Sequence, residues 1–157
     1  MKAYEKVLEI LQDYPYPLQK TENKIEIHNP ENEESLILSF QESDILLSFG
    51  HHEDRFDPYF DDEIYNLLKR IEDLLNNRIG IAALFYKDDE FYKLMGSCYC
   101  KKSDINKALE ETFAFILKFD EYRNKLETNG GMVSYQFFDP KDNRKQKIEK
   151  LTNPLFH

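Results

Sequence analysis

Apolar and polar residues alternate in three segments near the start of the chain, and this pattern predicts β-strands. The segments are 24–28 (KIEIH), 35–40 (SLILSF) and 44–49 (DILLSF). A short polar link at 41–43 fits a hairpin between the last two. We therefore expect an antiparallel meander with one buried face. That face consists of Ile25, Ile27, Leu36, Leu38, Phe40, Ile45, Leu47 and Phe49.

Apolar residues recur every three or four positions in three longer segments, which predicts amphipathic helices. These segments are 2–14, 61–77 and 104–126. Carboxylates at the start of the second helix suit its N-terminus, and Ser103 or Asp104 is expected to cap the third. The residues expected to face inward from the third helix are Ile105, Leu109, Thr112, Phe113, Ile116 and Leu117.

The remaining pattern predicts three more strands and a basic tail. The continuous apolar run at 78–87 indicates a central strand, followed by strands at 90–100 and 132–138. Residues 140–157 are basic and are expected to form a short, loosely docked helix. The order α-βββ-α-ββ-α-β predicts one globular α+β domain over 1–157, with a single mostly antiparallel sheet of about six strands and helices packed on one face.

Composition and local sequence features predict an aromatic-rich core and a cellular compartment for the protein. The 157 residues amount to one domain, and 14% of them are aromatic. The N-terminal segment carries acids where a signal peptide would be apolar, and no run reaches the roughly 18 apolar residues of a membrane helix. Cys98 and Cys100, two positions apart in a predicted strand, would share a face and would not pair easily. We therefore expect a reduced, cytoplasmic protein that does not contact membranes.

The net charge of −9 is spread unevenly along the chain. Residues 1–50 carry −6, residues 51–100 carry −5, and residues 101–157 carry +2. An acidic surface repels phosphate, which argues against nucleic acid as the main ligand. It attracts a basic protein and speeds their association. The alternative is that the acidic residues serve solubility alone.

The stretch 46–63 (LLSFGHHEDRFDPYFDDE) carries the candidate chemistry. We expect a loop after the strand, and three interpretations of it stay open. In the first, His51 or His52 joins Asp54 and Asp57 in a metal site, as in a small metal-dependent hydrolase. Adjacent histidines on an extended segment point opposite ways, however, so both reach one metal only if Gly50 kinks the chain. A zinc site also needs three or four converging ligands, and neither HxxxH nor HExxH spacing is present.

The second interpretation is structural, and the third is a surface for a partner protein. In the structural one, the three rings of the loop staple the corner between strand and helix. In the partner-binding one, a firm scaffold presents these rings as anchors, and carboxylates steer a basic partner. We prefer partner binding. The predicted contact residues are His51, His52, Asp54, Phe56, Asp57, Tyr59 and Phe60.

Other motifs add little chemistry. There is no GxSxG and no glycine-rich phosphate loop, and Cys98 lies in an apolar strand where a core role is favoured. We therefore predict no catalytic residue, no metal ligand and no cofactor. A structural domain that associates with a second copy of itself is a further alternative.

Residues 35–100 resemble a group of small bacterial proteins. The motif FGHHEDRFD, the leucine-striped helix and the run IGIAALFYKDDEFYKLMGS resemble Firmicute-type proteins, some of which are regarded as immunity proteins of contact-dependent or polymorphic toxin systems. His51, His52, Phe56 and Asp57 match the Phe-Gly-x-His-x-x-Phe-like loop of that group, whereas the Trp common in such loops is absent here. The resemblance implies a non-enzymatic cytoplasmic inhibitor that covers a cognate toxin.

Overall fold

The computed structural model describes residues 2–149 and shows an α+β fold with two antiparallel sheets. The chain divides into two compact units. Unit 1 extends to Arg78 and includes Phe138–Pro140, and unit 2 contains Ile79–Phe137 and the chain from Lys141 onward. That the whole chain forms one domain stays a prediction.

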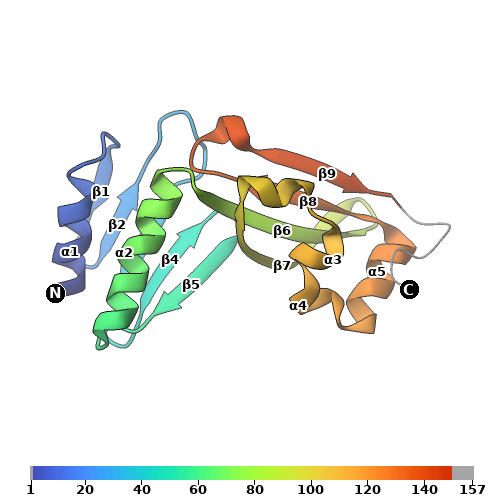
Figure 1. Cartoon of the computed structure of the whole chain (residues 1–157), viewed down its shortest axis with the longest axis horizontal. Coiled ribbons are helices and arrows are strands. Elements are labelled where there is room, and N and C mark those ends of the chain that lie inside the picture. Colours follow the sequence, from blue (N-terminus) through green and yellow to red (C-terminus); the bar gives the residue numbers. More distant parts are fainter. Residues whose placement is uncertain (1, 150–157) are drawn as a thin grey trace. The chain divides into compact units, whose positions relative to one another are not determined.

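Unit 1 is a five-stranded meander with two helices on one face (Figure 1). Its strands are neighbours in chain order, and every pair is antiparallel. Its elements are α1 (Lys2–Leu11), β1 (Leu18–Lys20), β2 (Lys24–Ile27), β3 (Leu36–Phe40), β4 (Ile45–Phe49), β5 (His52–Phe56) and α2 (Asp61–Leu75).

The core of unit 1 lies between this sheet and its helices. All eight apolar residues assigned to the buried face of 24–49 are at most 3% exposed, so that prediction is confirmed. Helix α1 adds Val7 and Leu11, and the ring of Tyr4 packs edge-on against Phe40. Phe138 completes the core, because its ring contacts Tyr16 and its carbonyl accepts hydrogen bonds from buried asparagine side chains.

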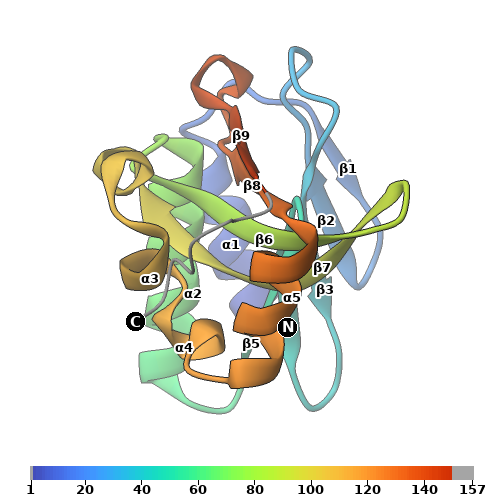
Figure 2. The same ribbon diagram turned by 90° about the vertical axis from the view of Figure 1, so that its right-hand side faces the viewer.

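Unit 2 is a four-stranded sheet with helical segments on one face (Figure 2). The strand order is β7-β6-β8-β9, so β6 is an inner strand, as its continuous apolar run predicts. The elements are β6 (Ile79–Asp88), β7 (Phe91–Lys101), η1 (Lys102–Asn106), α3 (Leu109–Thr112), α4 (Ala114–Leu117), α5 (Asp120–Asn129), β8 (Gly131–Gln136), η2 (Pro140–Asp142) and β9 (Arg144–Ile148).

The prediction of a single sheet of about six strands is wrong. Strand β6 pairs with β7 on one side and β8 on the other, so it has no edge left for a strand of unit 1. Strands β1 and β5 were not predicted as strands. β1 is three residues long, and β5 is polar at every position except its last, so neither carries a clear hydrophobic signal.

The prediction of one long helix at 104–126 is also wrong. The helical turns are interrupted at Phe113 (φ −115°, ψ 28°) and at Phe119, whose backbone is extended (φ −92°, ψ 123°). Leu117 and Leu126 both lie in the core of unit 2. In one straight helix at 3.6 residues per turn they would be about two and a half turns apart, on opposite faces. The breaks allow both side chains to be buried.

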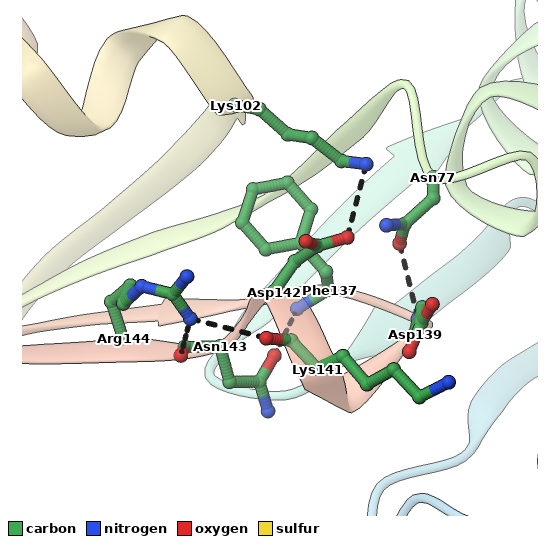
Figure 3. Close-up of polar contacts among 8 residues, drawn as sticks. All are labelled: Asn77, Lys102, Phe137, Asp139, Lys141, Asp142, Asn143 and Arg144. Carbon is green, nitrogen blue, oxygen red and sulfur yellow. Dashed lines mark hydrogen bonds and ion pairs between the residues drawn. The ribbon is translucent and has the colours of Figure 1, made fainter.

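The predicted C-terminal helix is wrong for Arg144–Ile148, which forms β9 and pairs with β8. The rest of that prediction, residues 150–157, lies outside the described residues. Polar contacts hold the turn between β8 and β9 (Figure 3). Asn143 Oδ1 accepts a hydrogen bond from the Phe137 N–H at 2.7 Å, and Lys102 pairs with Asp142 at 3.0 Å. In unit 1, Asn77 Oδ1 accepts the Asp139 N–H at 3.0 Å (Figure 3).

Within residues 2–149, no helix is both long enough and apolar enough to span a bilayer.

Candidate functional site

The stretch that contains the two histidines is a hairpin. Phe49 lies opposite His52, and Gly50 and His51 form a two-residue turn in which Gly50 has a φ of 57°. Glycine adopts a positive φ without strain, and two-residue hairpin turns favour glycine at their first position. The prediction of a loop is therefore wrong for His52–Phe56, which forms the edge strand β5.

The register of this hairpin assigns each residue of β5 to a face. His52, Asp54 and Phe56 lie opposite Phe49, Leu47 and Ile45, so they share the face that carries the core. Phe56 is 6% exposed and is a core residue, whereas His52 and Asp54 are half-buried. Glu53 and Arg55 are exposed on the opposite face.

A polar hollow of about 460 Å³ lies between β5 and α2. Three acidic and three basic residues line it, so the formal charges of the lining residues balance, and Arg55 is among them although its side chain belongs to the opposite face of β5. Its charged lining residues are Asp54, Arg55, Glu63, Lys69, Arg70 and Asp73. Arg55 pairs with Asp44 at 3.0 Å and Asp73 pairs with Arg78 at 3.0 Å, so two of these groups have their own partners.

His52 lies close to two of the charged groups of the hollow. Burial lowers the pKa of its imidazole below the ordinary value, and Arg70 acts in the same direction, while the carboxylate of Asp54 opposes both. The neutral imidazole is therefore favoured in the folded protein.

The residues that follow β5 form a corner held by hydrogen bonds. Asp57 Oδ1 accepts the Tyr59 N–H at 2.9 Å in an Asx-type turn, with Pro58 between them. The Tyr59 hydroxyl donates to the Glu42 carbonyl at 3.0 Å, which joins the corner to the β3–β4 turn. The Phe60 carbonyl accepts the N–H groups of the first turn of α2. The corner is thus tied to rigid elements on both sides.

Large aromatic rings are exposed at this corner. Tyr59 is 73% exposed, Phe60 62%, and Tyr65 66%. Tyr65 follows Asp61 and Asp62 by one helical turn, so the three share one side of α2. We name the set Asp57, Tyr59, Phe60, Asp61, Asp62 and Tyr65 the aromatic-acidic corner.

The two histidines are not brought together as ligands. His51 is exposed in the turn, and His52 is on the covered face of β5. Among residues 2–149, no group of three or more histidine, cysteine, aspartate or glutamate side chains is arranged to hold a metal ion.

Tyr65 and the polar side of α2 that lines the hollow were not among the predicted contact residues. Glu63, Asn66, Arg70 and Asp73 recur at helical spacing beside the apolar stripe, and this second stripe was the available signal.

The two cysteines are unpaired and belong to unit 2. Burial raises the pKa of Cys98, and it raises that of Cys100 to about 12. Thiols with raised pKa values are poor nucleophiles, which fits the core role inferred for Cys98.

No protein-family model, curated protein or solved structure matches this chain. The resemblance to immunity proteins therefore stays a prediction.

Proposed function

We propose that this chain is an acidic protein-binding module, and most concretely a cytoplasmic bacterial inhibitor of the immunity type that covers a basic toxin. The observation that carries the proposal is the aromatic-acidic corner, where three large rings are more than half exposed on a hydrogen-bonded frame. A rigid exposed ring buries much area on binding and loses little conformational entropy.

Charge favours a basic partner. Unit 1 contains 19 acidic and 8 basic residues, a net charge of −11, whereas the rest of the chain has 13 basic and 11 acidic residues. Asp57, Asp61 and Asp62 each lie within two residues of the exposed Tyr59 or Phe60 in the sequence. Aromatic anchors within a charged rim are typical of protein interfaces, which bury on the order of 1,600 Å².

The predicted contact residues have different roles in this proposal. Tyr59 and Phe60 are the anchors, and Asp57 shapes and charges the corner. His51 is exposed nearby in the hairpin turn, whereas Asp54 lines the hollow and His52 lies on the same face of β5 as Asp54. Phe56 supports β5 from the core and is not a contact residue.

The test uses the two proteins encoded on either side of this chain's gene, each purified separately, with affinity measured by calorimetry. An immunity protein is expected to bind one of them. The Tyr59→Ala/Phe60→Ala variant should bind at least about 30-fold more weakly, because each lost anchor typically costs 1 kcal/mol or more. The matched control is Phe91→Ala/Phe119→Ala, which removes two exposed rings from unit 2. Binding to neither product, or equal losses in both double variants, would overturn the proposal.

A further inference from the structure

Strand β5 has one open edge. It is the last strand of its sheet, and within residues 2–149 only β4 pairs with it. The two-residue turn makes Phe49 and His52 a hydrogen-bonded pair. Because such pairs alternate along an antiparallel ladder, the backbone groups of Glu53 and Arg55 point away from β4. An unpaired edge of this kind is a template for a further strand.

The side chain of Asp54 occupies part of this edge. Its Oδ1 atom accepts the Arg55 N–H at 2.8 Å, which confirms that this N–H points outward. A carboxylate in this position satisfies the donor in the unbound protein, and a carbonyl of an incoming strand could replace it without leaving a donor unpaired.

The hollow supplies space beside the edge. It lies between β5 and the polar stripe of α2, so a sixth strand at β5 would place alternate side chains into it. Its lining has balanced charge, which suits polar side chains. The other alternate side chains would lie on the solvent face beside Glu53 and Arg55.

We propose that the basic partner adds an extended, lysine- or arginine-containing segment to β5 as a sixth strand, with small polar side chains in the hollow. The inference rests on the proposed function and specifies how the partner is held. The segment spans about five residues, the length of β5. Its cationic residues lie opposite Glu53, and its end reaches the corner that directly follows β5. Main-chain hydrogen bonds to β5 hold the segment, and the rings of the aromatic-acidic corner anchor the rest of the partner.

The probe is a blocked peptide of seven alternating lysine and threonine residues, with lysines at both ends. The control peptide carries backbone N-methyl groups on its lysines, which keeps every charge and removes the donors aimed at β5. Amide exchange is followed residue by residue by NMR on the unmodified protein. We expect the first peptide to slow exchange at Arg55 and Glu53 at least about tenfold, and the second to leave it unchanged.

Two matched variants then separate backbone from side chain. Proline is tolerated where an edge N–H faces solvent, so Arg55→Pro removes the outward donor, whereas Arg55→Ala removes the same side chain and keeps the donor. We expect the peptide to bind Arg55→Pro at least about tenfold more weakly than Arg55→Ala. If Arg55→Pro does not fold, the exchange measurement decides alone.

The outcomes distinguish the two proposals. Unchanged exchange in β5 at about 5 mM peptide, or equal binding to both Arg55 variants, overturns strand addition. In that case the corner still stands as a docking surface if the Tyr59→Ala/Phe60→Ala variant loses its neighbouring-gene partner. Slowed exchange that both peptides cause equally would indicate attraction of charge alone, and it too overturns strand addition.

Discussion

At the residue scale, the hairpin shows how one edge strand combines a core residue with polar ones. Phe56 is buried, while His52 and Asp54 on the same face lie where the covering helix presents polar side chains instead of leucines. His52 is therefore partly desolvated without being part of an apolar core, and its protonation is coupled to folding.

His52 makes stability depend on pH in a definite direction. Its pKa is lowered in the folded protein, so the unfolded chain binds the proton more tightly. Its contribution is complete above the unfolded pKa of about 6.5 and is lost as pH falls below that value. We expect the urea midpoint to fall more between pH 7.5 and 5.5 for the parent than for His52→Gln. The other histidines are present in both proteins, so their contributions cancel in the comparison. Parallel pH profiles of the two proteins would contradict the lowered pKa of His52.

At the element scale, close backbone approaches decide how unit 2 is packed. Gly131 begins β8, directly after α5 and opposite Tyr86 of β6. A Cβ atom at this position would overlap the carbonyl oxygen of Phe85 and would come 2.8 Å from Leu126 Cδ2. One of these neighbours is backbone, so it cannot move aside cheaply, and only glycine lets β8 come this close to β6 and α5.

Substitution at Gly131 should therefore be costly. We expect Gly131→Ala to lower the free energy of unfolding by about 2–3 kcal/mol, in the range of overpacked cores. Urea denaturation measures this free energy. The control is Thr128→Ala at an exposed position, which we expect to change stability by less than about 0.5 kcal/mol. Equal effects of the two substitutions would show that β8 can shift to make room.

The hydrophobic pattern predicted the elements better than their boundaries and pairing. Helix α2 and strand β6 were found because each carries a long apolar signal that burial reinforces. The segment 104–126 carried the same signal, yet its apolar residues are brought to the core by breaks at Phe113 and Phe119. The spacing of apolar residues indicates which side chains can be buried together in a regular helix. It does not show where the helix breaks to bury them.

At the scale of the whole molecule, charge is divided between the two units. The acidic excess of the chain lies in unit 1, which also carries the aromatic-acidic corner and the open edge of β5. Long-range attraction of a cation acts before contact, so it raises the association rate more than it slows dissociation.

Association with a cation should therefore weaken with salt. For the lysine–threonine peptide, we expect the association rate constant to fall at least about tenfold between roughly 0.05 and 0.5 M NaCl, because screening shortens the range of the field. Stopped-flow fluorescence of a labelled peptide measures it. Asp61→Asn/Asp62→Asn should give a shallower salt dependence than the parent. A rate constant indifferent to salt would show that the acidic excess does not steer binding.

The sequence by itself determined the strands with strict alternation, the striped helix and the acidic character of the first part of the chain. These properties are local, because each depends on residues a few positions apart. It also pointed to the stretch after Phe49, where Tyr59 and Phe60 are exposed on a short, hydrogen-bonded corner.

Only the tertiary structure decided the strand pairing and the surroundings of each polar residue. Phe138 follows a strand of unit 2 but packs with Tyr16 and Phe49 of unit 1, and β5 forms a strand although its residues are mostly polar. The position of Phe138 depends on partners far away in the chain, and β5 depends on backbone hydrogen bonds to the neighbouring strand β4. The local hydrophobic pattern encodes neither of them. The polar stripe of α2 is present in the sequence, but only the packing of α2 beside β5 forms it into one wall of a hollow.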